Sequence, residues 1–409
     1  MGYSKSVVSG FSWQTLLKGA TYTVTFGKLF VLARILSPSD FGLFSLVAIT
    51  IGIMESLTET GVNITLLQAK QSISYYLDSA WVISIIRGLL IGLIMLVTGL
   101  GLQEFFSEPQ LIGLISIAAV IPVIKGFINP MIISYQKNLK FFQDSAYRLS
   151  LVTVEALFVV GFAIALHSVY AFVFGLLAAA FFEVLLSQLL FADRPRFQYA
   201  PSRGATILSN AWWLSPASFL HYIADNVDDF IIGRLAGTHS LGIYHNGYAL
   251  SHKLNYELSK SVFHASMPVF TKIVDSPERL RKAFLKSTVA ALLLICTLST
   301  PLLLFPDLVI RILLGDAWLA VIPIVRPLVF AGIFHSVSTL VQSLLLAKKK
   351  YVPINIHLLL TCIAMSLGIW FGFQTAGLYG ATIGLAIARL ILLPVITFFA
   401  YQSLATPNE

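Results

Sequence analysis

Residues 212–244 read WWLSPASFLHYIADNVDDFIIGRLAGTHSLGIY, a long apolar segment that contains several ionisable side chains. In a helix, spacings of three and four residues place His221, Asp225, Asp228 and Asp229 on one face. A charge at the centre of a membrane-spanning helix costs about 2.5 to 3.5 kcal/mol on translocon-based scales, so this face cannot be turned toward lipid. We therefore expect it to line a hydrated path or to contact other helices, and these four residues are candidates for coupling or gating.

The same stretch has an earlier counterpart at an offset of 200 residues. Arg34 corresponds to Arg234 and Gly42 corresponds to Gly242. Each pair falls where one apolar segment ends and a glycine-marked turn leads into the next, which is typical of an internal repeat. We therefore predict two halves of similar size, each of which contains this turn motif.

The composition of the chain is that of a polytopic membrane protein. Of its 409 residues, 57% are hydrophobic and only 11% are charged, whereas soluble domains are about 25% charged. Apolar segments of the ~17 to 25 residues that cross a bilayer recur along the chain, so we predict an all-α fold of about twelve transmembrane helices. The approximate ranges are 10–34, 42–66, 79–102, 111–135, 146–166, 169–191, 206–234, 241–269, 284–305, 320–346, 352–373 and 377–401.

The Lys and Arg residues between these segments are unevenly distributed. Fifteen of them lie in or beside the even-numbered breaks, and three lie in the odd-numbered breaks. The positive-inside rule therefore places the even-numbered breaks and both termini in the cytoplasm. These clusters account for the formal net charge of +8. They serve as orientation signals and contact anionic lipid headgroups, so no nucleic-acid partner is expected.

The predicted helices divide into two parallel lobes of six. Because six is an even number, both halves enter the membrane from the same side, as in transporters whose two bundles rock about a central site. We expect an N-lobe at residues 1–192 and a C-lobe at residues 206–409. Residues 193–205 contain Pro, Arg and Gly and are expected to form a cytoplasmic linker between the lobes.

Ionisable residues inside the spans gather in the first two helices of each half. At the 200-residue offset, Lys28 corresponds to Asp228, which predicts opposite charges at related depths of the two lobes. If these helices face one another, they line a hydrated path that carries both signs of charge. Ordinary interhelical hydrogen bonds remain an alternative role for the acids of the second span. The acidic coupling or gating candidates from these helices are Glu55, Glu59 and Glu257.

Sequence motifs for catalysis are weak. The chain has no P-loop, HExxH or paired CxxC motif, and we expect neither a metal site nor a cofactor. The run from Asp225 to Asp229 reads DNVDD and resembles, in reverse order, a carboxylate cluster that holds a metal-bound diphosphate. Such chemistry normally requires a second acidic cluster to hold Mg²⁺, and the chain has no convincing one. A membrane prenyl- or glycosyl-transferase is therefore the weaker alternative.

Two segments of the chain resemble a known transporter family. Residues 33–44, ARILSPSDFGLF, and residues 228–250, DDFIIGRLAGTHSLGIYHNGYAL, are similar to the polysaccharide transporter branch of the multidrug/oligosaccharidyl-lipid/polysaccharide exporter superfamily. The resemblance is to bacterial flippases for O-antigen, colanic-acid and teichuronic-acid repeat units. It implies two six-helix lobes that form a V around a central cavity, and alternating access without ATP hydrolysis.

The resemblance also implies a substrate, an oligosaccharide on a polyprenyl diphosphate, which is moved across the bacterial cytoplasmic membrane for cell-surface polysaccharide biosynthesis. Such a molecule needs a polar route, because hydrocarbon excludes its charged and hydroxylated part while the prenyl tail stays in lipid. A basic group in the cavity would receive the diphosphate, and the acidic face of the seventh span would bind a coupling proton or sodium ion. The basic candidates are Lys18, Lys28, Arg87 and Lys253.

The expected partners are therefore the lipid-linked oligosaccharide, membrane lipids and other polysaccharide-assembly proteins. The main transport alternative is a cation-coupled multidrug exporter of the same superfamily, which would share the fold. Drug susceptibility of an expressing strain distinguishes this exporter from a flippase, and a covalent product formed in membranes would indicate the enzyme.

Overall fold

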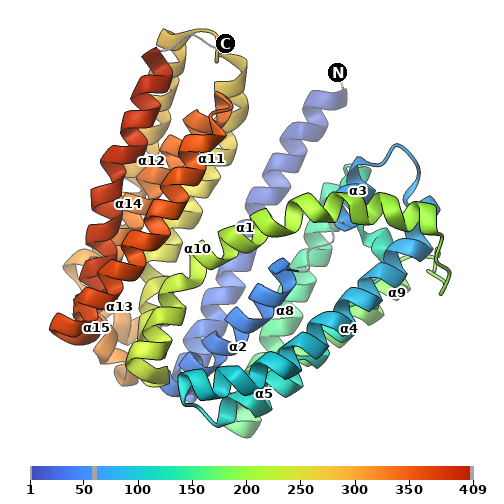
Figure 1. Ribbon diagram of the computed structural model, residues 1–409, viewed down its shortest axis with the longest axis horizontal. Helices are drawn as coiled ribbons and strands as arrows, with labels where there is room; N and C mark the ends of the chain where they lie inside the picture. Colours follow the sequence, from blue (N-terminus) through green and yellow to red (C-terminus); the bar gives the residue numbers. More distant parts are fainter. Residues whose placement is uncertain (1, 58–61, 406–409) are drawn as a thin grey trace. The chain divides into compact units, whose positions relative to one another are not determined.

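The computed structural model describes residues 2–57 and 62–405, and within these ranges the chain forms helices and no strand (Figure 1). The all-α fold expected from the composition is confirmed. The chain divides into two compact units, which we name unit 1 (Met1–Ile223) and unit 2 (Ala224–Glu409). The boundary between them falls within a long bent helix, α10 (Pro201–Tyr248).

Unit 1 begins with two long helices joined by a short capped turn. The backbone N–H and the hydroxyl of Ser37 donate to Asp40 Oδ2 at 2.9 and 2.6 Å, so these polar groups at the start of the second helix are satisfied. Pro38 is the first residue of that helix, where its missing N–H is not needed. Besides the first part of α10, the helices of unit 1 are α1 (Gly2–Ile35), α2 (Pro38–Leu57), α3 (Val62–Gln68), α4 (Ile73–Phe106), α5 (Gln110–Ala118), α6 (Val120–Lys125), η1 (Pro130–Ile133), α7 (Ser134–Lys137), α8 (Phe141–Leu166) and α9 (Tyr170–Leu190).

Helix α4 approaches α5 and α6 closely through glycines. A Cβ at Gly88 would lie 2.3 Å from the carbonyl oxygen of Pro122, and a Cβ at Gly92 would lie 2.8 Å from that of Ala119. Small residues four positions apart allow two helix backbones to touch in this way. The backbone of α4 is therefore in direct contact with the backbone of α5 and α6 at these glycines.

The segment expected to form the fourth span is broken. Its two pieces, Gln110–Lys125 and Pro130–Lys137, are bent by 69° relative to one another. Asn129 caps the second piece, because its side chain accepts a hydrogen bond from the N–H of Met131 at 3.0 Å. The single helix expected over residues 111–135 is therefore replaced by a broken one, a form that transporters use where backbone lines a cavity.

The segment between α9 and α10, and the first turn of α10, contact the first turns of α4. The backbone N–H of Arg196 donates to Asp78 Oδ1 at 2.7 Å. Arg203 Nη1 donates to the carbonyl oxygen of Tyr75 at 2.9 Å, and its guanidinium lies 4.1 Å from the centroid of the Tyr75 ring. Residues 193–205, expected to link two lobes, thus belong to unit 1 and pack against α4.

Unit 2 is built around α14, which packs against α11, α12 and α15. Figure 1 shows α12, α14 and α15 side by side. The two arms of α15 are separated by a break at Ala376 and Gly377, and they meet so closely that a Cβ at Gly368 would lie 2.5 Å from Gly384 O. Besides the second part of α10, the helices of unit 2 are η2 (Ala249–Lys253, a π-helical turn), α11 (Leu254–Lys272), α12 (Pro277–Leu304), α13 (Pro306–Leu313), η3 (Asp316–Val321), α14 (Ile322–Ala347) and α15 (Tyr351–Ala405).

Seven helices in the described ranges are long and apolar enough to cross a membrane, or eight if the bent pair in unit 1 is one span. The chain is thus a multi-pass membrane protein. Helices α1, α10 and α11, where further spans were expected, contain concentrations of ionisable residues and are not among the seven. The count of twelve spans stays a prediction.

Candidate functional site

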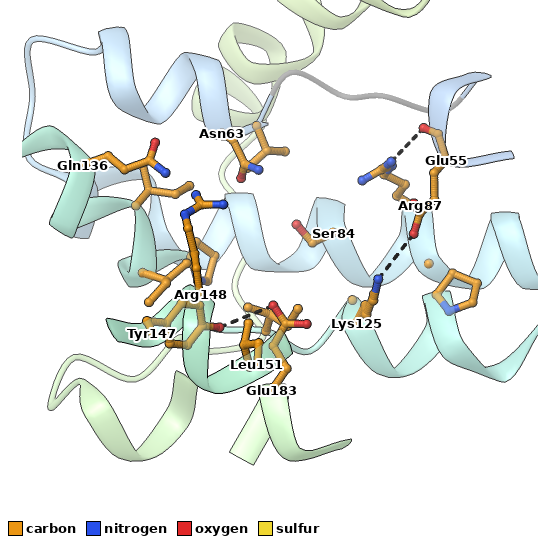
Figure 2. A pocket seen from close by; sticks show the side chains of 18 of the residues that line it. Glu55, Asn63, Ser84, Arg87, Lys125, Gln136, Tyr147, Arg148, Leu151 and Glu183 are labelled. Atoms are coloured by element: carbon orange, nitrogen blue, oxygen red, sulfur yellow. Dashed lines mark hydrogen bonds and ion pairs between the residues drawn. The ribbon is translucent and has the colours of Figure 1, made fainter. Parts of the chain in front are cut away.

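Two cavities of about 350 Å³ each lie within unit 1 and share part of their lining. We name the first the charged cavity (Figure 2). Its polar lining consists of Glu55, Asn63, Ser84, Arg87, Lys125, Gln136, Asp144, Tyr147, Arg148 and Glu183. The residues shared with the second cavity are Glu55, Lys125, Leu151 and Glu183. Both volumes fall within the ~300 to 1,000 Å³ of typical ligand sites.

Close helix packing positions two of the basic side chains. Arg87 precedes Gly88 on α4, and Lys125 ends α6 directly before Gly126. A Cβ at Gly126 would lie 2.9 Å from the carbonyl oxygen of Ser84, so the backbones touch on both sides of the pair. Arg87 and Lys125 therefore reach the same cavity from adjacent helices.

Both of these cations interact with Glu55, near the end of α2. Lys125 Nζ lies 3.8 Å from Glu55 Oε1, and Arg87 Nη2 donates to the backbone carbonyl oxygen of Glu55 at 2.9 Å. The side chains of Lys125 and Glu55 are 42% and 39% exposed. At that distance and exposure the ion pair is loose and solvated, so it contributes little to stability.

A second group of polar side chains comes from α7, α8 and α9. Tyr147 OH donates to Glu183 Oε1 at 3.4 Å, as the dashed line in Figure 2 marks. Arg148 Nε donates to Asp144 Oδ2 at 3.1 Å, and Gln136 Nε2 donates to Asp144 Oδ1 at 3.4 Å. Asp144 is buried and needs these donors, whereas the Arg148 side chain is 52% exposed.

The second cavity has an apolar wall. Small, aliphatic and aromatic residues of α2, α8 and α9 line it, together with Glu155 and the charged residues that it shares with the charged cavity. Glu155 forms a 2.8 Å ion pair with Lys28 of α1. Lys28, expected from the sequence to receive the diphosphate, is therefore paired with a carboxylate and is not among the residues that line either cavity.

Unit 2 contains another concentration of ionisable side chains. Helix α10 bends at Gly237, where φ is +75°, a conformation that glycine adopts without strain. The bend brings Tyr244 next to Asp228 and His245 next to Asp229. Tyr244 OH donates to Asp228 Oδ2 at 2.6 Å, and His245 Nδ1 lies 3.0 Å from Asp229 Oδ2. Both carboxylates are buried.

Aromatic and imidazole rings of α10, η2, α11 and α14 stack on one another in the same unit. The ring of Tyr248 stacks on His252 and that of Tyr256 on His335, with centroids 4.2 Å apart in each pair. His335 Nδ1 lies 3.2 Å from His252 Nε2, and Arg389 of α15 is buried in the same unit. Such polar groups stabilise an interior only when they satisfy one another. We give the name buried polar network to a set of buried and half-buried side chains: Asp228, Asp229, Tyr244, His245, Tyr248, His252, Tyr256, His335 and Arg389.

Comparison with known proteins gives the family. A family model described as "Polysaccharide biosynthesis protein" matches residues 31–323 of the chain. The chain belongs to this family. This polysaccharide biosynthesis protein is 22% identical over 400 residues to the lipopolysaccharide biosynthesis protein WzxC of Escherichia coli (strain K12), with 96% of this chain and 80% of WzxC covered. It is 20% identical over 349 residues to the teichuronic acid biosynthesis protein TuaB of Bacillus subtilis (strain 168), with 85% and 72% covered.

Solved structures of transporters share the fold of this polysaccharide biosynthesis protein. An inward-facing multidrug resistance MATE family transporter of the MOP superfamily matches with a TM-score of 0.71 at 13% identity, over 94% of each chain. The lipid II flippase MurJ in an inward closed conformation matches with a TM-score of 0.67 at 13% identity, over 95% of this chain and 87% of MurJ. The family resemblance expected from the sequence is confirmed.

The structure of this polysaccharide biosynthesis protein brings together part of the expected site. Arg87 and Glu55 line the charged cavity and interact with one another. Lys18 and Lys253 have helical backbone. Their side chains, and Glu59 as a whole, lie outside the described part of the structure.

The four candidates of α10 differ in exposure. His221 and Asp225 are exposed, whereas Asp228 and Asp229 are buried. The face expected from the spacing is therefore divided between two environments, because the bend in α10 covers only its second half. Glu257 lies 3.8 Å from a lysine one turn further along α11.

The repeated turn motif lies at corresponding helix ends. Arg34 is exposed near the end of α1 and donates to the backbone carbonyl oxygen one turn earlier at 2.7 Å. Arg234 is exposed three residues before the bend at Gly237. Gly42 and Gly242 are buried. These positions therefore mark where the chain changes direction in each half.

Several residues of the cavity and the network are not indicated by the sequence patterns. Lys125 lies at the break of the fourth expected span, and Arg148 belongs to a basic cluster that signals orientation. His252 and His335 look like unrelated histidines, because they are 83 residues apart. The four-residue spacing of rings over Tyr244–Tyr256 is the one signal that points to a polar aromatic stripe.

Proposed function

We propose that this protein translocates oligosaccharide repeat units, carried on a polyprenyl diphosphate, across the cytoplasmic membrane for the synthesis of cell-surface polysaccharide. The relatives support this function, because they are named for lipopolysaccharide, teichuronic acid and succinoglycan biosynthesis, the last as a transport protein. The observation that carries the proposal is the charged cavity within a unit of apolar helices. Such a cavity provides the polar route that a saccharide needs through hydrocarbon.

The proposed architecture has twelve spans in two parallel six-helix lobes that form a V around a central cavity. The 200-residue repeat supports it, because corresponding arginines lie at corresponding helix ends. The two arms of α15 and the bent pair in unit 1 supply spans beyond the single straight helices. The distribution of Lys and Arg supports cytoplasmic termini.

The proposed mechanism is alternating access between the two sides of the membrane. The prenyl tail stays in lipid while the polar part of the substrate occupies the hydrated interior, so no charge has to cross hydrocarbon. Asp225 on exposed α10 surface, and the buried acids one turn further, are proposed to bind a coupling proton or sodium ion. Binding of an ion there would favour one conformation over the other, which is what coupling requires.

A comparison of cells with and without the gene tests the function. Lipid-linked saccharides are extracted, and the membrane face that displays them is determined with an impermeant glycan-modifying enzyme. We expect the deletion strain to accumulate complete repeat units on the cytoplasmic face. Failure to make the units would indicate an enzyme instead, and an unchanged lipid pool together with altered drug susceptibility would indicate a multidrug exporter.

A further inference from the structure

We infer that the charged cavity binds the saccharide part of the transported lipid and not its diphosphate, an inference that rests on the proposed function. Among the residues that the structure describes, the charges on the cavity wall balance. Its acidic residues are Glu55, Asp144 and Glu183, and its basic residues are Arg87, Lys125 and Arg148. A diphosphate is multiply negative and binds where positive charge is in excess, so a balanced wall does not suit it.

The basic groups also lie beside acceptors of the protein itself. Arg148 Nε donates to Asp144, and Arg87 donates to the carbonyl oxygen of Glu55. Lys28 of α1, one of the basic candidates for binding the diphosphate, forms a 2.8 Å ion pair with Glu155. Carboxylates beside Arg148 and Lys28 therefore offset part of the positive charge in unit 1, which lowers its attraction for a phosphate group.

The same arrangement suits hydroxyl groups. A sugar hydroxyl both donates and accepts, so it is satisfied where a carboxylate and a cationic N–H lie side by side. The cavity offers this combination at Glu55 with Lys125, and Asn63 and Gln136 add amides that both donate and accept. A site made of such groups discriminates strongly against ligands that lack the matching hydroxyl.

The exposure of the wall shows that these groups are available to a ligand. The 3.8 Å distance between Lys125 and Glu55, with both side chains about 40% exposed, is too long for a tight pair. The Arg148 side chain is 52% exposed despite its bond to Asp144. Glu183 lines both cavities, so a saccharide longer than the charged cavity would still contact it.

Binding by the purified full-length protein in lipid nanodiscs tests the inference. One probe is the water-soluble saccharide released by mild acid from the lipid-linked units of the deletion strain, and the other is farnesyl diphosphate, which has no sugar. We expect Glu183→Gln and Glu55→Gln to weaken saccharide binding about tenfold or more, as loss of a hydroxyl-matching group does, and to leave farnesyl diphosphate binding unchanged. Asp316→Asn, a matched acid-to-amide change at an exposed ion pair in unit 2, should affect neither probe.

Protection of an introduced thiol gives an independent measurement that does not depend on the stability of these variants. In a background with Cys296→Ser and Cys362→Ser, the change Asn63→Cys places a thiol on the cavity wall. The saccharide should slow its reaction with a water-soluble maleimide at least threefold, whereas farnesyl diphosphate should not. Ser72→Cys, an exposed position of unit 1 that does not line the cavity, is the control.

The outcomes separate the inference from the proposed function. If the variants weaken farnesyl diphosphate as much as the saccharide, or if farnesyl diphosphate alone protects the thiol, the cavity is a diphosphate site and the inference is wrong. If neither probe protects the thiol while the wild-type protein still moves lipid-linked units in cells, the saccharide binds elsewhere and only the inference falls. If the lipid-linked units cross without the gene, the proposed function falls as well.

Discussion

One ion pair on the cavity wall of unit 1 and one buried acid of unit 2 are held in opposite ways. In unit 1, Glu55 and Lys125 are 3.8 Å apart and about 40% exposed on a cavity wall. In unit 2, Asp228 is 2% exposed and accepts a 2.6 Å hydrogen bond from Tyr244. A loose, solvated pair can exchange its partner for a ligand at little cost, whereas removing the partner of a buried group is strongly destabilising.

The largest expected effect is loss of an acid from the buried polar network. Asp228→Ala leaves the Tyr244 hydroxyl buried without its acceptor, and we expect the free energy of unfolding to fall by roughly 3 kcal/mol. Unfolding by SDS titration in detergent measures the change. Asp316→Ala, at an exposed pair of the same unit, is the control. Equal losses in the two variants would mean that burial of Asp228 has no energetic consequence.

A smaller effect is expected where the charged cavity is assembled. Gly88→Ala places a Cβ 2.3 Å from the carbonyl oxygen of Pro122, so α4 and α6 must separate, at a cost of about 2 kcal/mol. Gly101→Ala is a matched control in the same helix, because its Cβ would meet nothing within 4 Å. The midpoint temperature of thermal unfolding should fall for Gly88→Ala. Gly101→Ala should leave the free energy of unfolding unchanged or raise it by up to ~1 kcal/mol. Two equally stable variants would contradict the close packing.

The same chemical change in both units sharpens the comparison. Tyr244→Phe removes a buried 2.6 Å hydrogen bond to Asp228 and should cost about 2 kcal/mol. Tyr147→Phe removes a longer 3.4 Å bond to Glu183 beside a cavity and should cost less than about 1 kcal/mol. Unfolding measurements on the two variants under identical conditions give the difference. A larger loss of stability for Tyr147→Phe than for Tyr244→Phe would contradict the difference described between these two hydrogen bonds.

The smallest effect on stability is expected at the loose pair of the cavity. Glu55→Gln should change the free energy of unfolding by less than about 0.5 kcal/mol, because the ion pair with Lys125 is long and solvated. Transport in cells should nevertheless decrease, if Glu55 contacts the saccharide. A variant that unfolds readily would show instead that Glu55 contributes to stability as much as Asp228 does.

The sequence predicts the membrane class, the helical fold and the family. Apolar segments of span length determine these features, since a backbone in lipid must satisfy its own hydrogen bonds. The sequence also indicates Arg87 and Glu55 as interior charges, and both line the charged cavity. Conversely, the pairing of Lys28 with Glu155 depends on contact between helices 127 residues apart, which no local pattern contains.

The break after Lys125 explains why other residues of the cavity are not predicted. Periodicity treats residues 111–135 as one apolar helix, whereas the chain bends there by 69°. The bend lies beside close contacts with α4, because Gly88 of α4 and Gly126 after α6 allow the backbones to touch. Likewise, the bend at Gly237 determines which acids of α10 are buried, and helical spacing alone does not predict this bend.

Transport in a reconstituted system tests the central claim most directly. Purified full-length protein is placed in liposomes with lipid-linked repeat units confined to the inner leaflet, and the units that reach the outer leaflet are counted with an impermeant glycosidase. We expect the wild-type protein to expose the units many times faster than protein-free liposomes, and Glu183→Gln to slow this exposure. Exposure at the protein-free rate with folded wild-type protein would contradict translocation by this chain.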